Sequence, residues 1–555
     1  MSPLHSPVPD PPTPPAEISP PPDLAAQPAS QASRRGSSRL NLFRSSHGHT
    51  VGSAAMLLMI SSLLSGVLAL VRIKYVNFLF GAGPAQDAYR AAFKLPDLLS
   101  YFLTGGAVAI SLITVLNRYL VNDDEEGADR ALSVIMTTML LVLCAGVVLA
   151  EFVAPYYVWF ANKGFRHDPL RFDLCTSMTR IILPAQLFFF LGSCMSARLQ
   201  VRKIFIYQAG VPVVYNTGII LGALFLHRQM GIYSLAVGVL AGVIAGALLL
   251  NTLGAMRTGL RYRPVIGFRD PAFVEWFKLT LPLMIGVSLV MFDGYFLNYF
   301  GSLREGGITV IGNAKDLFNA PFNVIGPAAG AASLPFFASL YQQGRTRDFS
   351  ASVSRSVSRL FAVGMLVSAW MIALAPWLLD LFRGGKFNQA ATVETTRLFS
   401  ILSVTLAIWA VQGIYARSFY AASDTRTPAI TGTLITVLSI PMYWSLFYTL
   451  GLEGLALASD LGILVQTGTL AVLLHRKRLV NFSHLEFGEL GRSFAAAIAA
   501  LLAAGAVVRA LPHVSSHSGD LLIIAAGTAV WALLCFGVLR LTGSRLPNQL
   551  LRRNA

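Results

Sequence analysis

The chain has 555 residues, of which 54% are hydrophobic and only 13% are charged. This balance excludes a soluble globular protein, because apolar runs of about 20 residues, each long enough to cross a bilayer, recur after residue 50. In a soluble protein the net charge of +16 would favour a nucleic-acid partner. Here the basic residues lie in short loops between apolar runs, where they orient a membrane protein, so no nucleic acid is expected.

Residues 1–50 are rich in proline and serine and begin SPLHSPVPDPPTPPAEISPPP after the first methionine. Such a segment cannot bury a core, so we expect a disordered tail. Four arginines (Arg34, Arg35, Arg39 and Arg44) precede the first apolar run and should hold the tail in the cytoplasm.

About fourteen membrane-spanning helices are predicted in the rest of the chain. Their expected ranges are 53–80, 87–119, 128–160, 172–200, 204–226, 231–255, 271–300, 308–340, 350–382, 390–422, 427–450, 453–475, 489–511 and 519–541. Alternate loops differ roughly threefold in their content of Arg and Lys. That asymmetry predicts an even number of spans in a multi-pass protein, with the N- and C-termini both cytoplasmic.

A weak internal repeat relates the two halves of the chain. Its matches are Phe93-x-x-Pro96 with Phe318-x-x-Pro321, and Lys163-Gly164-Phe165 with Gly385-Lys386-Phe387. The offset of about 215–225 residues is close to six helices, so both copies share one orientation. We predict an all-α membrane protein with an N-lobe at 51–260, a C-lobe at 261–480 and a parallel pseudo-two-fold axis. Helices 13 and 14 and a cytoplasmic tail occupy 481–555.

The second predicted span carries four charged side chains: Asp87, Arg90, Lys94 and Asp97. On a helix they fall within an arc of roughly 80°. Each charge at mid-bilayer costs roughly 2.5–3.5 kcal/mol, so this face should line a wet cavity between the lobes. The alternative is a helix end among lipid headgroups, which fits Asp87 and Arg90 but not the two deeper residues.

The repeat places the eighth span opposite this face, and both lobes then offer cations to a shared cavity. Arginine can clamp phosphate oxygens through paired N–H donors, whereas lysine acts as a point charge. The predicted binding residues for an anionic head group are Arg72, Arg90, Lys94 and Lys315, supported by Asp87, Asp97, Asp316 and Asn319. The alternative is that these charges only pair with one another and hold the lobes together.

Catalysis and metal binding are not expected. No Ser/His/Asp order, phosphate-binding loop or histidine cluster occurs, and the four cysteines lack metal or redox spacing. We therefore predict that the protein is not an enzyme and has no cofactor. Coupling to a monovalent cation stays open, with Asp293 and Asp460 as candidate ligands inside apolar helices.

Three stretches carry a family resemblance: FGAGPAQDAYRAAFKLPDLL followed by GGAVAIS, then LFRGGKFNQAATVETTRLFSI and ARSFYAASDTRTPAI. They resemble signatures of the MurJ/MviN family of lipid II flippases, in the multidrug/oligosaccharidyl-lipid/polysaccharide exporter superfamily. The resemblance covers essentially everything after residue 50. It implies a fourteen-helix, monomeric flippase of the bacterial inner membrane that serves cell-wall synthesis. Its lipid-linked oligosaccharide substrate would be the undecaprenyl-pyrophosphate-linked peptidoglycan precursor, moved outward by alternating access.

The resemblance further implies that helices 1, 2, 7 and 8 enclose the cavity and that helices 13 and 14 form a groove for the lipid tail. Arg72 and Asp87 match family residues, and Asp293 lies where some relatives place a sodium ligand. The departures are Gly66 and Ser100 in place of arginines, Gly105 in place of an acidic residue, and Lys315-Asp316 in place of Asp-Arg. These departures keep two alternatives open: transport of another polyprenyl-linked glycan, or a membrane scaffold that does not transport.

Overall fold

The computed structural model describes residues 51–103, 106–284, 289–330, 333–511 and 517–547. The predicted tail at 1–50, Gly105 and the last eight residues lie outside these ranges. The described chain is built from helices, with one isolated β-bridge between Gly384 and Phe387.

The first half of the chain forms ten α-helices and two helices of other types. They are α1 (Val51–Phe80), α2 (Pro84–Ala92), α3 (Lys94–Leu103), α4 (Gly106–Val121), α5 (Glu125–Ala161), η1 (Lys163–His167), α6 (Pro169–Ile182), α7 (Ala185–Val201), α8 (Ile206–Met230), α9 (Tyr233–Val243), η2 (Ile244–Leu250) and α10 (Asn251–Arg257). Side chains that bond the first free backbone N–H groups begin two of these helices: Asp124 accepts from Gly127 N at α5, and Asp168 from Arg171 N at α6.

The second half forms ten further α-helices and one short 3₁₀ helix. They are α11 (Pro271–Met284), α12 (Leu289–Gly301), α13 (Gly307–Gly330), α14 (Ser333–Gln342), α15 (Thr346–Asp380), α16 (Gln389–Ser403), α17 (Leu406–Ala421), α18 (Arg426–Arg476), η3 (Phe482–His484), α19 (Phe487–Ala510) and α20 (His517–Leu541).

Within the described ranges, nine helices are long and apolar enough to cross a membrane, or ten if α16 and α17, bent by 44°, form one span. The difference from the expected fourteen has a physical origin. Three predicted spans, 87–119, 271–300 and 308–340, are divided into shorter helices, and α18 holds two predicted spans joined at Gly451, where φ is 62°. Membrane proteins tolerate broken helices where the freed backbone groups face protein or a wet cavity. The count of fourteen stays a prediction.

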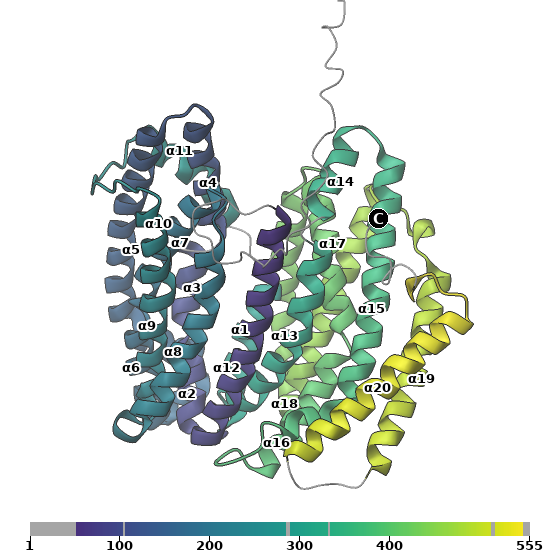
Figure 1. Cartoon of the computed structure of the whole chain (residues 1–555). Coiled ribbons are helices and arrows are strands. Elements are labelled where there is room, and N and C mark those ends of the chain that lie inside the picture. The colour runs from purple at the N-terminus through teal and green to yellow at the C-terminus, as the bar shows by residue number, and fades with distance from the viewer. Residues whose placement is uncertain (1–50, 104–105, 285–288, 331–332, 512–516, 548–555) are drawn as a thin grey trace, which may run out of the picture. The chain divides into compact units, whose positions relative to one another are not determined.

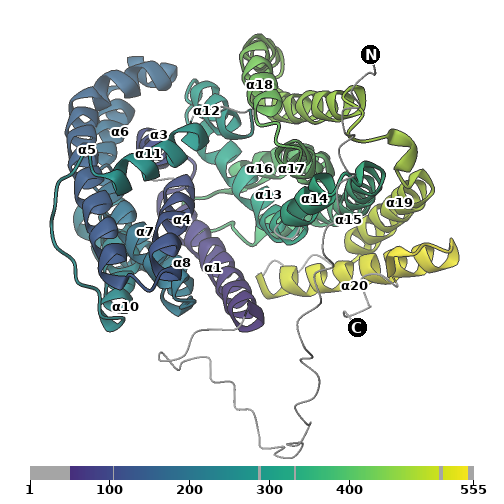
Figure 2. The same cartoon turned by 90° about the horizontal axis from the view of Figure 1, so that it is seen from above.

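The helices gather in two groups, which Figures 1 and 2 show from two directions. Helices α2–α10 form one group, to which α1 is added through its packing on α8. Helices α13–α20 form the other, with α12 packed on α18. By packing, α11 sides with the first group, because its Trp276 is fully buried in a cluster with Leu112 and Leu132. The sequence had placed α11 in the C-lobe range, 261–480; the lobe ranges stay a prediction.

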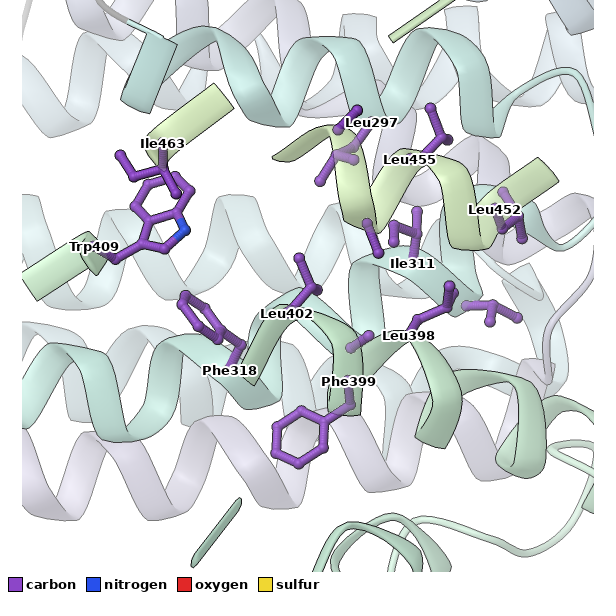
Figure 3. Close-up of a cluster of buried hydrophobic side chains, with 14 of the residues drawn as sticks. Leu297, Ile311, Phe318, Leu398, Phe399, Leu402, Trp409, Leu452, Leu455 and Ile463 are labelled. Carbon is purple, nitrogen blue, oxygen red and sulfur yellow. The ribbon is translucent and has the colours of Figure 1, made fainter. Parts of the chain in front are cut away.

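Each group has its own apolar core. In the second group, Phe318 of α13, Phe399 and Leu402 of α16, and Leu455 of α18 are fully buried members of one cluster, in which the Phe318 ring packs against that of Trp409 of α17 (Figure 3). This cluster fixes α13 against α16–α18, and α13 in turn carries the charged residues that face the other group.

The last two helices pack on α15 at the outer edge of the second group (Figures 1 and 2). The face of α19 toward α15 is built of small side chains, among them Ala496 and Ala500, both fully buried. Small residues let membrane helices approach closely, because packing rather than hydrophobic burial drives their association in lipid. Both helices also carry exposed apolar side chains, such as Leu502 of α19 and Leu533 of α20. The predicted tail groove on these helices stays a prediction.

Glycines set the close contact of α8 with α9. A Cβ atom at Gly218 would lie 2.5 Å from the Cα atom of Gly242. We expect Gly218→Ala to push the helices apart and lower the free energy of unfolding by about 1–3 kcal/mol, the usual cost of overpacking. Thermal unfolding of the detergent-purified protein measures this change.

Gly537→Ala is the matched control, because nothing lies within 4 Å of a Cβ atom at Gly537. Alanine forms helices better than glycine by about 0.8–1 kcal/mol, so this control should hold or raise the melting temperature. Equal melting temperatures for Gly218→Ala and the wild type would contradict the close contact.

Candidate functional site

A cavity of about 620 Å³ lies between the two groups, walled by α1, α2, α3, α12 and α13. Eight of the ten residues predicted to form the site line this cavity. They are Arg72, Arg90, Lys94, Asp97, Asp293, Lys315, Asp316 and Asn319. Of the four charged residues predicted to form a stripe, Arg90, Lys94 and Asp97 line this cavity and Asp87 does not. The three are thereby kept away from lipid, where each charge would be costly.

Arg90 bridges the two helix groups. Its Nη1 atom lies 2.9 Å from Oδ2 of Asp316 on α13, and its Nη2 donates to Asn313 Oδ1. Gly312 makes room for this guanidinium, since a Cβ atom there would lie 2.6 Å from Nη1. In this conformation Arg90 therefore pairs across the interface, as expected if the charges hold the lobes together.

Lys315 is enclosed by partners. Its Nζ atom lies 2.9 Å from Asp293 Oδ2 and 3.2 Å from Ser459 Oγ, and 4.0 Å from the centre of the Trp409 ring. The Tyr443 hydroxyl donates to the other oxygen of Asp293 at 2.6 Å. The Asp293 charge is thus already balanced by an ammonium group, and Lys315 is not free to meet a phosphate in this state.

Asp460 lies behind this pair rather than in the cavity wall. It is buried and accepts a hydrogen bond from Thr405 Oγ1, and it is near enough to Lys315 for electrostatic attraction. The two carboxylates predicted to hold a coupled cation, Asp293 and Asp460, therefore have the Lys315 ammonium as their neighbour. Cation coupling through them stays a prediction.

Arg72 and Lys94 are the two predicted cations without a close ion pair, although Asp97 is near enough to attract Lys94. Neither forms an ion pair with any residue in the part of the chain that the structure describes. The Nζ atom of Lys94 lies 5.4 Å from the centre of the Tyr295 ring, beside Gly294 of α12. A guanidinium and an ammonium on the wall of one cavity, without paired anions, form the region of this site best suited to an anionic ligand.

Asp87 lies outside the cavity, so its predicted role as a supporting cavity charge is wrong in this conformation. Its carboxylate is fully buried and accepts from Gly306 N at 2.7 Å, Thr309 N at 2.8 Å and Thr309 Oγ1 at 2.7 Å. These donors lie at the start of α13, where free N–H groups and the helix dipole favour an anion. Asp87 therefore holds α2 to the N-terminus of α13.

Loops from both groups close the same end of the interface. Gly164 N donates to Ser302 Oγ at 3.1 Å, and Lys386 N donates to the Phe78 carbonyl at 2.9 Å. The Arg171 guanidinium adds a hydrogen bond of 3.1 Å to the carbonyl of Ser302. Gly164 and Lys386 belong to the matched tripeptides of the internal repeat, so each copy of the repeat supplies one loop that reaches the opposite group.

The loop backbones meet without intervening side chains. A Cβ atom at Gly164 would lie 1.9 Å from the Ser302 carbonyl oxygen. Gly81 has φ of 68°, and a Cβ atom there would lie 2.5 Å from the Lys386 carbonyl oxygen. The sequence did not mark Arg171 or Ser302 as site residues. The one available signal for this closure was the match of Lys163-Gly164-Phe165 with Gly385-Lys386-Phe387.

Comparison with known proteins identifies relatives over most of the chain. The family model described as "Lipid II flippase MurJ" matches residues 76–527. A probable lipid II flippase MurJ of Vibrio cholerae is 26% identical over 431 residues, covering 75% of this chain and 81% of the relative. A lipid II flippase MurJ of Burkholderia cenocepacia is 27% identical over 414 residues, covering 72% and 79%.

Two solved structures share the fold. A lipid II flippase MurJ in an inward closed conformation superposes with a TM-score of 0.70 at 20% identity, over 87% of this chain and 99% of that one. An inward-facing transporter of the multidrug resistance MATE family, of the MOP superfamily, gives 0.60 at 15% identity, over 77% and 98%. At these identities the likeness concerns the fold alone.

The Lys315–Asp293 pair yields a test of the site's electrostatics. Asp293→Asn keeps the side-chain size but leaves the mostly buried Lys315 ammonium, 16% exposed, without its carboxylate at 2.9 Å. Removing one partner of a buried pair costs about 3–5 kcal/mol, so the variant should unfold more readily in denaturant. The double variant Asp293→Asn/Lys315→Met removes both charges and should recover most of the loss. Equal stability of Asp293→Asn and the wild type would contradict the pairing.

Proposed function

Because the chain belongs to the lipid II flippase MurJ family, we propose that it carries a lipid-linked peptidoglycan precursor from the cytoplasmic to the outer leaflet of the bacterial inner membrane. One observation supports the proposal above the others. Arg72 and Lys94 line a cavity between two matching helix groups and form no close ion pair with any of the described residues. Cations held at that depth are costly unless a ligand or water meets them.

The diphosphate of the substrate is the group we assign to these two cations. The Arg72 guanidinium can bind two phosphate oxygens at once through parallel N–H donors, and Lys94 adds a point charge. A volume of about 620 Å³ is in the range of ordinary ligand-binding cavities. Arg90 and Lys315 are two further cations that can bind the phosphate. When phosphate enters the cavity, their ion pairs with Asp316 and Asp293 can exchange for contacts with the ligand.

Transport then proceeds by rocking of the N-lobe against the C-lobe about the cavity. With both termini in the cytoplasm, as the basic loops predict, the closed end lies on the outer side and the cavity is reached from within. Opening outward breaks the contacts of Asp87 with Gly306 and Thr309 and those of Lys386 with Phe78.

We propose that the protein works as a monomer, without cofactor or nucleic acid. Lys315 supplies the positive charge beside Asp293 and Asp460.

A second candidate keeps the mechanism and changes the glycan. Gly66 and Ser100 stand where the family resemblance implies arginines, so the cavity has fewer cations than that pattern. A different polyprenyl-linked glycan would then be the cargo, and exchanging lipid-linked substrates in a reconstituted flipping assay separates the two. A scaffold that does not transport would move no substrate in that assay.

Arg72 carries the main functional prediction. Arg72→Ala removes the guanidinium from the cavity wall and should abolish growth of a flippase-depleted strain that depends on this protein. Arg228→Ala, an exposed arginine at the end of α8, is the matched control and should support growth. Membrane levels of both variants are compared by immunoblot. Full growth with Arg72→Ala at normal levels would argue against the assignment.

Asp87 carries a conformational prediction. Asp87→Asn removes the charge that meets the N-terminus of α13, and hydrogen bonds to charged groups contribute about 1.5–3 kcal/mol. The closed end should open more often. In a background without native cysteines, Asn319→Cys in the cavity wall should therefore react faster with a membrane-impermeant thiol reagent added outside. Asp380→Asn, whose ion pair is to nearby Arg383, is the control. An unchanged labelling rate would show that Asp87 does not hold this end closed.

A further inference from the structure

A second chamber of about 450 Å³ lies within the first helix group, among α3, α7 and α8. We call it the side chamber. It shares three lining residues with the central cavity, namely Phe93, Asp97 and Tyr215. The two spaces therefore meet at the charged end of α3, and a ligand in the central cavity has the side chamber directly beside it.

The two chambers have opposite chemistry. The central cavity is lined by Arg72, Arg90, Lys94 and Lys315, whereas no Lys or Arg lines the side chamber. Its one charged group is the carboxylate of Asp97. Opposite charges that lie side by side in this way suit a ligand that carries an anionic and a cationic group at different points.

Two acceptors of the side chamber lack donors. The Asp97 side chain is exposed and its carboxylate has no hydrogen bond or close ion pair with any residue in the described ranges; the Lys94 ammonium is near enough to attract it but lies beside Tyr295 of α12. Gln186 of α7 is 4% exposed, and its side-chain oxygen is buried without a hydrogen-bond partner. Buried polar atoms are nearly always satisfied, so the Gln186 oxygen points to a donor that is absent from the bare chain, and the exposed Asp97 carboxylate offers a charged acceptor in the same chamber.

We propose that the side chamber binds a primary ammonium group of the transported molecule. An ammonium has three donors and no acceptor, which matches a carboxylate and an amide oxygen. The inference rests on the proposed function, because a peptidoglycan precursor has a diphosphate at one end and a peptide with a free amine at the other. The diphosphate lies on Arg72 and Lys94, and the amine lies on Asp97 with Gln186. Asp97 is then a substrate-binding residue, not a support for the cations as the sequence predicted.

The test compares two substrates in vesicles that contain the full chain: the lipid-linked precursor with its free peptide amine, and the same molecule after N-acetylation. For the wild type we expect acetylation to slow flipping by about tenfold, because one charge-assisted hydrogen-bonded contact is lost. Asp97→Asn should slow the free-amine substrate by a similar factor and remove the preference between the two. Gln186→Leu should reduce the preference in part, and Asp380→Asn should retain it.

The outcomes separate the inference from the function on which it depends. If the wild type flips both substrates at one rate, the ammonium site is wrong and the flippase stands. The same conclusion follows if the rate depends on sodium or proton concentration but not on acetylation, since Asp97 would then hold a free cation. If the wild type flips neither substrate, the proposed function fails and the side-chamber site with it. The comparison in the wild type needs no variant, so misfolding of Asp97→Asn would not weaken it.

Discussion

The free energy of placing a charge inside a membrane governs this structure. Each ionised side chain at bilayer depth must meet an opposite charge, a hydrogen-bond partner or water. The protein uses all three solutions along one interface. Lys315 meets Asp293, and Asp87 meets the first N–H groups of α13, whereas Arg72 and Lys94 face a cavity. The interface between the helix groups is therefore at once the structural joint and the place where a charged ligand finds free partners.

This division explains how two interpretations of the same charges can both hold. Pairing between Arg90 and Asp316 keeps the groups together in the observed conformation. In the proposed function, Arg72 and Lys94, which form no close ion pair among the described residues, meet the anion. A site in which every cation were already paired would have to break an ion pair for each phosphate contact. A site in which no cation formed an ion pair would have little to stabilise its charges in the absence of ligand.

The sequence predicted those features that depend on periodicity and on the cost of exposure. The spacing of Arg90, Lys94 and Asp97 predicted a face turned away from lipid, and in the structure these residues line a cavity. The destination of Asp87 could not be predicted, because its partners are mainly backbone N–H groups, which any residue carries. Nor could the sequence decide that Lys315 pairs with Asp293, which lies on another helix, since that choice depends on three-dimensional distances. The break between α2 and α3 lies three residues before Pro96, which has no N–H to donate to the Ala92 carbonyl, so hydropathy alone does not reveal it.

The burial of Asp87 has a consequence for the opposite state of the transport cycle. Its carboxylate and the N–H groups of Gly306 and Thr309 satisfy one another only while the closed end is intact. Once that end separates, Asp87 keeps Arg171 of its own helix group, 4.0 Å away, but the hydrogen bonds that Gly306 and Thr309 supplied must be replaced, and the N–H groups of α13 need new acceptors, which solvent can provide. Outward opening should therefore be a wetting transition: the gap between the loops fills with water as it widens, and a released sugar chain is hydrated before it has left.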